Sequence, residues 1–500
     1  MGKYFYWSSW FLVITILVIA PSFSITGFSY FDQKKITQFG VLFFNSVVFI
    51  YFFLKYQLVD VSEKTHLAFW GILFLLLISS LLAPLPHWAL IQIGWYLLIL
   101  ELLILFTFLY LKNQEQFLKS FLIGILLMVV LYSIRVYADY ISGLFNDNWS
   151  VWPEQHKVVY TRDGIVLNPS AHLGFNHVRF FNHMQTWTLP LLVFAYQYFR
   201  EKLIPGIRYL FLGFIGTWWM LVFAADARGT MVASLISILF IGVVFREKSK
   251  KFLRIYFATT VVGLLLYYVL FYFPQSGGRE ILSRFGDSGR LDVWLYSIQQ
   301  IFNNPMFGLG PMHFSYMGNN PPWSTPHNII LQSAAEWGIP ATLLAIYLVF
   351  SGFYKFVKQS LADRIFENDS LVLLRITLVT SLLAALTHSM VSGIFNSSLS
   401  QLIMVIVVAM AIGDFYRHSD KNLFQKRKKR SAPSLLVTVM LVVNSIFVGF
   451  HVSQDIPHLD NRKREFFTRY NDYTLYPRFW HQGMIYEHTD SSEIKDTGDN

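Results

Sequence analysis

The stretch Ser324-Thr325-Pro326-His327-Asn328 opens an apolar run that continues to Phe350. The run predicts one membrane-spanning helix, His327–Phe350, with Ser324 or Thr325 as its N-cap and with Pro326 suited to the first helical position. His327 and Asn328 then lie in the first turn, at the membrane surface. The positive end of the helix dipole there favours a neutral imidazole, which can accept a proton, and it attracts anions such as phosphates. This helix end is therefore a place where a base and a phosphate-bearing substrate can meet.

The composition indicates a membrane protein. Of the 500 residues, 54% are hydrophobic and only 14% are charged, whereas soluble proteins carry about a quarter charged residues. The sequence has no cysteine, which excludes disulfides, thiol nucleophiles and thiolate metal sites. The net charge of +10 lies mostly in short loops between apolar runs, as membrane topology requires. A nucleic-acid partner is therefore not expected.

The apolar runs predict an all-α polytopic membrane protein with about twelve or thirteen transmembrane helices, since a spanning helix needs about 20 residues. The first run follows Lys3 and is expected to be a retained anchor, because Pro21-Ser22-Phe23 is a poor cleavage site for a signal peptide. The runs lie near Tyr6–Phe23, Phe39–Tyr56, His66–Leu82, Trp88–Leu111, Phe117–Asp139, Met184–Phe199, Ile207–Phe223, Thr230–Phe245, Phe252–Phe273, His327–Phe350, Leu371–Val391, Ser398–Tyr416 and Ser434–His451.

Positive charge predicts the orientation. Four basic loops fall on one side of the membrane, which is expected to be the cytoplasm, with the amino terminus inside and the carboxyl tail outside. Lys34 and Lys35 violate this pattern. The basic loops contain Arg200 to Arg208, Arg246 to Arg254, Lys355 to Arg364 and Lys426 to Arg430.

The chain is expected to divide into alternating membrane and outward parts. Two long loops face outward, and the second carries Leu291–Phe302, whose apolar spacing predicts a helix on the outer membrane surface. The predicted parts are N-terminal helices 1–139, a loop 140–183, central helices 184–273, a large loop 274–326, C-terminal helices 327–451 and a tail 452–500.

Polar residues gather near the outward ends of the predicted helices. A buried arginine at mid-depth is costly, so several arginines and histidines on one face imply a wet cavity or an anionic ligand. Planar guanidinium groups match phosphate oxygens two at a time. The candidates are Arg135, Asp139, His183, Asp226, Arg228, His327 and His388.

Each candidate also has a plainer interpretation. Arg135 can extend its charge to the interface, and Asp226 with Arg228 can form a local ion pair that closes a turn. His183 and His388 are better explained as hydrogen-bonded packing residues. Arg375 is expected to be an ordinary anchor at the cytoplasmic edge.

Several signals of phosphate and metal binding are missing from the sequence. It contains no Gly-x-x-x-x-Gly-Lys-Ser/Thr loop, no Asp-x-Asp in an outward loop and no His-x-x-x-His cluster. A divalent metal site is therefore not predicted, no cofactor is expected, and neutralisation of phosphate would depend on arginines.

Four segments in order resemble the O-antigen ligase and O-antigen polymerase superfamily, which includes protein O-oligosaccharyltransferases. The likeness runs from about Phe180 to Leu344. The segments are Phe181-Asn182-His183-Met184-Gln185, the turn Asp226-Ala227-Arg228-Gly229, Trp294 with Asn304-Pro305-Met306-Phe307-Gly308-Leu309-Gly310 and Phe314, and His327-Asn328-Ile329-Ile330-Leu331-Gln332 with Glu336-Trp337-Gly338-Ile339-Pro340.

The resemblance implies a metal-independent, inverting membrane glycosyltransferase with a GT-C-like fold, in the bacterial inner membrane with its site facing the periplasm. The donor would be a glycan on undecaprenyl diphosphate. His327 would be the base that activates the acceptor hydroxyl, and Arg228 and Arg290, helped by Arg179, would bind the diphosphate. Asn328, Asn182, His183, Asp226 and Glu336 would be supporting residues. Ala227 departs from the serine that is common in the family, so one hydroxyl contact is lost.

The resemblance leaves the acceptor open. Ligation to lipid A–core is favoured, because the tail 452–500 is small for a protein-directed enzyme. A polymerase that extends another lipid-linked unit remains compatible, and aromatic and basic residues around Tyr470–Trp480 keep a protein acceptor open. A lipid-linked glycan transporter or flippase is the competing class. It would need charged residues at mid-depth and paired broken helices, and only Glu101 is well placed for that.

Overall fold

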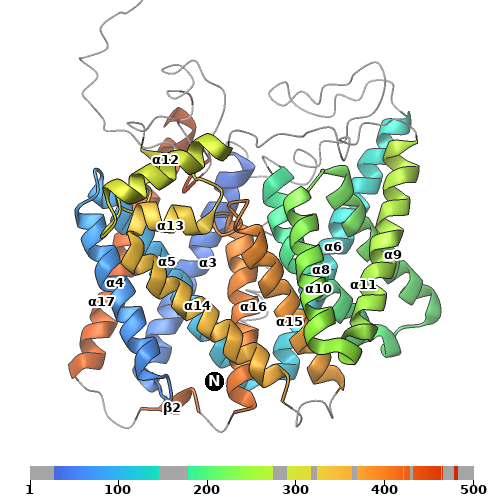
Figure 1. The fold of residues 1–500 in the computed structure, drawn as a ribbon, viewed down its shortest axis with the longest axis horizontal. Helices are drawn as coiled ribbons and strands as arrows, with labels where there is room; N and C mark the ends of the chain where they lie inside the picture. Colours follow the sequence, from blue (N-terminus) through green and yellow to red (C-terminus); the bar gives the residue numbers. More distant parts are fainter. Residues whose placement is uncertain are drawn as a thin grey trace, which may run out of the picture.

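The structure, a computed structural model, describes residues 28–145, 175, 178–273, 290–316, 324–362, 369–419, 422–427, 432–462, 464, 478–481 and 483. These residues form an all-α polytopic membrane protein, as predicted (Figure 1). Within them the only strands are β1 (Tyr56–Leu58) and β2 (Phe424–Lys426), which pair antiparallel with Gln57 opposite Gln425. The predicted first span, Tyr6–Phe23, lies outside the described residues.

Long helices stand side by side and pack around one apolar core. Ten helical stretches of the described part are long and apolar enough to cross a membrane, and one of them, Arg228–Tyr272, contains both α10 and α11. The long helices are α3 (Tyr30–Lys55), α4 (Glu63–Leu81), α5 (Pro86–Lys112), α6 (Gln114–Phe145), α8 (Val178–Phe199), α9 (Pro205–Ala224), α10 (Arg228–Phe245), α11 (Lys250–Tyr267), α14 (Ile339–Ser360), α15 (Asp369–His388), α16 (Ser398–Arg417) and α17 (Ala432–Asp455). Short helical turns are η2 (Arg200–Lys202), η3 (Arg246–Ser249), η4 (Tyr268–Tyr272), η5 (His313–Ser315) and η7 (Ile456–His458).

The predicted single helix His327–Phe350 is wrong, because the chain breaks at Gly338. A short helix, α13 (Ile329–Trp337), precedes the long helix α14. Asn328 is the N-cap of α13, and its side chain accepts from the amides of Ile330 and Leu331. Neither Ser324 nor Thr325 caps this helix, and Pro326 is not helical.

Close backbone packing explains the break. Gly338 has φ of 84°, and a Cβ there would lie 2.3 Å from the carbonyl oxygen of Met306. The amide of Ile339 donates to the carbonyl of Pro305 at 2.8 Å. Only glycine adopts this conformation without a steric penalty, so α13 and α14 can meet at an angle against the 305–306 backbone.

Helix α12 (Arg290–Asn303) confirms the predicted amphipathic segment Leu291–Phe302. It buries Val293 and Ser297 against α13 and exposes Leu291, Leu295, Ile298 and Phe302. In Figure 1 it lies with α13 across one end of the long helices. An exposed apolar row at this place is suited to the membrane interface.

Lys34 and Lys35 lie inside α3 rather than in a loop, because α3 begins earlier than the predicted run Phe39–Tyr56. Both are buried. The ammonium of Lys35 lies over the ring of Trp95 at 3.9 Å and over that of Phe479 at 4.5 Å. Aromatic faces attract a cation, which explains how this end of α3 accommodates lysine.

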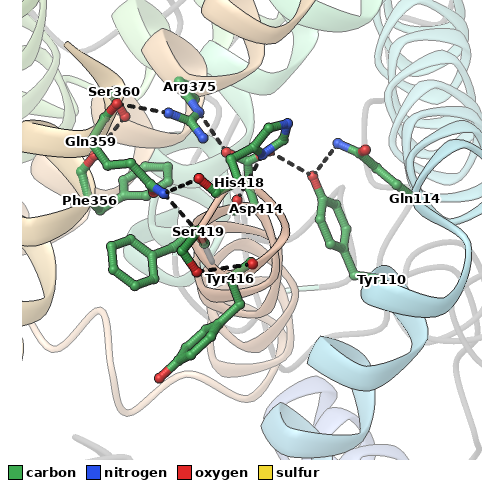
Figure 2. A network of polar contacts seen from close by, with 11 residues as sticks. Tyr110, Gln114, Phe356, Gln359, Ser360, Arg375, Asp414, Tyr416, His418 and Ser419 are labelled. Carbon is green, nitrogen blue, oxygen red and sulfur yellow. Dashed lines mark hydrogen bonds and ion pairs between the residues drawn. The ribbon is translucent and has the colours of Figure 1, made fainter. Parts of the chain in front are cut away.

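Arg375 is fully buried, so its predicted role as an interfacial anchor is wrong. Its Nε donates to Oδ2 of Asp414 at 2.6 Å, and its Nη1 donates to the carbonyl of Gln359 at 3.1 Å. Figure 2 shows this network, with Tyr110 reaching Asp414 from α5. The pair therefore ties α15 to α16 and to the end of α14, which a snorkelling side chain would not do.

The two ends of the helices differ in character. One end carries the β1–β2 pair and the basic turns η2 and η3. The opposite end carries α12, α13 and the start of α10. The four segments that resemble the ligase superfamily therefore lie away from the basic end.

Candidate functional site

The turn before α10 presents Arg228 at the head of the helix. Asp226 has φ of 47°, and the amide of Arg228 donates to the carbonyl of Asp226 at 2.8 Å. Nε of Arg228 lies 3.5 Å from Oδ2 of Asp226, and 47% of the Arg228 side chain is exposed against 5% for Asp226. The carboxylate is thus covered, and about half of the Arg228 side chain is exposed.

Gly229 brings α10 against the imidazole of His388 at the end of α15. A Cβ on Gly229 would lie 2.6 Å from Nε2 of His388. The other ring nitrogen, Nδ1, lies 2.7 Å from the hydroxyl of Thr186 on α8, which is 3.0 Å from that of Thr230. His388 therefore occupies the crossing of three helices beside Arg228.

Asn182 and His183 lie within α8, which begins at Val178 rather than at the predicted Met184. Both are buried. Nε2 of His183 lies 2.7 Å from the hydroxyl of Ser392, and the His183 and His388 rings meet edge to face at 5.4 Å. The Asn182 carbonyl accepts from Thr186. These contacts are those of residues that position neighbouring helices.

His327 lies one residue before the N-cap of α13, in a segment bonded to two other elements. Its φ is 56°, and its amide donates to the hydroxyl of Thr325 at 3.0 Å. Nε1 of Trp294 on α12 donates to the carbonyl of Pro326 at 2.8 Å. The amide of Ile329 donates to the carbonyl of Ser389 at 3.0 Å, so the backbone that follows His327 is tied to the end of α15.

Arg290 and Arg179 each lie in the first turn of a helix. Arg290 is the first residue of α12, is half-buried, and lies one turn before Trp294, which donates to the carbonyl of Pro326. Arg179 is exposed in the first turn of α8, one turn before Asn182 and His183. The heads of α8, α10, α12 and α13 therefore surround the end of α15. Helix heads carry partial positive charge, so the arrangement suits an anion.

Glu336 is fully buried in α13 and forms an ion pair that the sequence analysis did not find. Nη2 of Arg478, from the C-terminal tail, lies 2.7 Å from Oε2 of Glu336. Burial raises the pKa of Glu336, and the charge of Arg478 opposes that shift. The only sequence signal was the mixture of basic and aromatic residues around Tyr470–Trp480. The two partners are separated by 142 positions, so no local pattern links them.

Two other charged residues considered in the sequence analysis lie apart from this arrangement. Arg135 is half-buried in α6, and Glu101 is buried in α5. Within the residues that the structure describes, no group of three or more histidine, aspartate or glutamate side chains is placed to hold a metal ion.

Comparison with known families places a match over residues 211–346, to the family described as O-antigen ligase. Residues 211–346 are therefore similar to the O-antigen ligase domain. This confirms the resemblance to the O-antigen ligase and polymerase superfamily, and it supports a membrane glycosyltransferase that acts on a lipid-linked glycan and an acceptor. The ligase domain runs from α9 into α14 and contains Arg228, Arg290 and His327, whereas Asn182, His183 and His388 lie outside it. No curated protein matches the chain.

Proposed function

We propose that this protein transfers a glycan from undecaprenyl diphosphate to an acceptor hydroxyl at the periplasmic face of the bacterial inner membrane. One observation carries the proposal. Arg228, Arg290 and His327, which are far apart in sequence, lie on segments linked to the end of α15. Gly229 packs on His388, Trp294 of α12 donates to the carbonyl of Pro326, and the amide of Ile329 donates to the carbonyl of Ser389. The ligase domain that contains all three supports it.

The proposed reaction is an inverting displacement. The acceptor oxygen forms a bond to the anomeric carbon while the bond from that carbon to the diphosphate oxygen breaks. The leaving undecaprenyl diphosphate takes the electron pair. His327 accepts the proton of the acceptor hydroxyl, as a general base does. No metal is required in this scheme, because the charge that develops on the diphosphate is stabilised by arginines.

Arg228 and Arg290 would bind the diphosphate, with Arg179 as a third cation at the rim. Arg228 is suited to this role because about half of its side chain is exposed while its partner Asp226 is covered. The converging helix heads add backbone dipoles of the same sign. Asn328 supports His327 by capping α13, and Asn182, His183 and Glu336 support it through the packing of α8 and α13.

Ligation to lipid A–core is the acceptor reaction that we favour. The tail segment 478–481 packs on the helix ends. A tail bound in this way favours the ligase over a protein-directed enzyme with a separate acceptor domain. Polymerisation of lipid-linked units and transfer to a protein hydroxyl are the other two outcomes.

His327→Ala is the central test, with His458→Ala as the matched control because His458 is exposed at the same end of the protein. Donor lipid extracted from cells that lack the gene is mixed with purified protein and acceptor. Removal of a general base should lower the transfer rate about 10²–10⁴-fold, with expression unchanged. Transfer near the control rate by His327→Ala would remove His327 from the mechanism.

Arg290→Lys tests the diphosphate contact. Lysine keeps the charge but loses the two-pronged geometry, so donor affinity and transfer should both fall. Full activity and unchanged donor affinity in this variant would contradict diphosphate binding at Arg290.

The glycan profile of a deletion strain separates the acceptors. Loss of long chains with accumulation of lipid-linked polymer indicates a ligase. Accumulation of single lipid-linked repeats indicates a polymerase, and normal lipopolysaccharide with an unmodified glycoprotein indicates a protein acceptor. Transfer by purified protein in detergent, where no membrane gradient exists, would exclude a flippase without covalent chemistry.

A further inference from the structure

The segment 478–481 returns from the C-terminal tail and is buried among the helix ends. All four residues, Arg478, Phe479, Trp480 and His481, have buried side chains. The ring of Phe479 meets that of Trp95 edge to face at 5.1 Å. Nε1 of Trp480 donates to Asp455 at 3.0 Å, and the amide of His481 donates to Asp32 at 2.8 Å. The segment is thus anchored on α3, α5 and α17, independently of Arg478.

The guanidinium of Arg478 binds the segment that contains His327. Its Nη2 donates to both carboxylate oxygens of Glu336, at 3.1 and 2.7 Å. Its Nη1 donates to the carbonyl of Ser324 at 3.1 Å. The side-chain oxygen of Gln332, in its satisfied orientation, accepts from both Nη atoms at 2.5 Å. One side chain therefore contacts the 324–336 segment at three places.

These contacts lie on both sides of His327 in the sequence. Ser324 lies three residues before it, and Gln332 and Glu336 lie on α13 after it. Glu336 is itself fixed, because its carbonyl accepts from the hydroxyl of Ser79 and from the amide of Gly310, both at 2.9 Å. The guanidinium thus joins the loop that precedes His327 to a helix that is already fixed.

A buried ion pair contributes little to stability compared with apolar residues of similar volume. Arg478 and Glu336 are nevertheless both buried, with side-chain exposures of 2% and 0%. The planar fork of arginine can bind a carboxylate and a carbonyl at once, at fixed directions. What this pair provides beyond packing is therefore the orientation of the Ser324 carbonyl and of the loop that follows it.

We propose that Arg478 is a positioning residue for His327, so that the C-terminal tail forms part of the working site. The Arg478 side chain contacts no reacting atom. It fixes the position of the loop that carries His327. The inference rests on the proposed function for its kinetic test, and a second test is independent of catalysis.

The kinetic test compares Arg478→Met with Arg464→Met, an exposed tail arginine paired with Asp460. A base displaced by about 1 Å can lose about 10²-fold in rate, so kcat should fall by that order in Arg478→Met and stay unchanged in Arg464→Met. In the His327→Ala background, Arg478→Met should cost little more, because effects within one unit are not additive. Equal losses in both backgrounds would show a general folding effect and overturn the proposal.

Arg478→Lys covers the case in which Arg478→Met does not fold. Lysine keeps a positive charge beside Glu336, but a single ammonium lacks the fork that spans Glu336 and the Ser324 carbonyl. It should therefore fold and still transfer about tenfold more slowly or worse. Full kcat in Arg478→Lys would overturn the proposal.

The second test measures the loop itself. The chain has no cysteine, so Ser324→Cys introduces a single labelling site at a buried position whose carbonyl accepts from Arg478. Maleimide labelling should be slow in this protein and in its Arg464→Met derivative, and about tenfold faster or more with Arg478→Met, as local opening becomes easier. Equal rates would overturn the positioning role. If labelling changes as expected but the parent protein transfers no glycan, the proposed function fails and the positioning of the loop stands.

Discussion

Gly229→Ala tests the close approach of α10 to His388. An added Cβ would lie 2.6 Å from Nε2 and 2.8 Å from Cδ2 of the imidazole, whereas ordinary contact begins at 3.4 Å. The ring cannot simply turn away, because Nδ1 lies 2.7 Å from the hydroxyl of Thr186. The head of α10 must therefore shift by about 0.8 Å relative to α15, and Arg228 shifts with it.

Two opposing effects set the size of the stability change. Overpacking in a close-packed interior costs about 1–3 kcal/mol, while alanine is favoured over glycine within a helix by about 1 kcal/mol. The net change should lie between zero and a loss of about 2 kcal/mol. The loss of transfer should be larger, on the order of 10²-fold, because a displacement near 1 Å disrupts a positioned charge.

Gly242→Ala is the matched control, since Gly242 lies on the same helix and its added Cβ would meet only Leu253, at 3.8 Å. Thermal unfolding in detergent gives the stability, and glycan transfer per folded protein gives the activity. The control should be neutral or slightly stabilised and fully active. If Gly229→Ala matched the control in both measurements, the steric coupling of Arg228 to His388 would be wrong.

Three further predictions concern stability. Arg375→Met should cost about 3–5 kcal/mol in thermal unfolding, because it removes the guanidinium that pairs with the buried Asp414 carboxylate, and Arg375→Met with Asp414→Leu should recover most of that loss. Burial lowers the pKa of His313 to about 4. The contribution of the neutral imidazole to the free energy of unfolding is therefore complete above the unfolded pKa of about 6.5 and is lost as pH falls toward 4. His313→Gln should flatten the curve of the unfolding midpoint against pH over that window. Gly338→Ala, with φ of 84° and a Cβ 2.3 Å from the Met306 carbonyl, should abolish the α13–α14 angle and fail to yield folded protein, whereas Gly352→Ala, where a Cβ meets nothing within 4 Å, should express normally.

Hydropathy was sufficient to predict most of the long helices in the described part of the chain, because each needs only a run of apolar residues and a charged boundary. The run ending at Phe350 was misjudged for the same reason, since hydropathy does not change at Gly338. Gly338 is a helix-stop signal, and Pro340, two residues later in the first turn of α14, is a helix-start signal. Together they could have divided the predicted helix His327–Phe350. These glycine and proline positions therefore indicate the helix boundary that hydropathy does not.

Buried charges were beyond local prediction. Arg375 lies in an apolar run, and its partner Asp414 lies on the next helix, so the sequence alone favoured an anchor at the interface. Arg478 and Glu336 present the same difficulty over a longer separation. A lone charge in such a sequence indicates that a partner is needed, but only the packing of helices identifies it.

The parallel arrangement of α12 and α13 explains how the fold brings Arg290 and His327 to the same end of the helices. Trp294, near the head of α12, bonds Pro326, just before the head of α13, and the tail of α12 meets the end of α13 through the bond from Ile339 to Pro305. The two helices therefore run in the same direction, and both heads lie at the end of α15. An antiparallel pair would place Arg290 near Gly338, a full helix length of about 13 Å from His327. The proposed chemistry thus depends on the parallel order of α12 and α13, because only that order places Arg290 and His327 at adjacent positive helix ends.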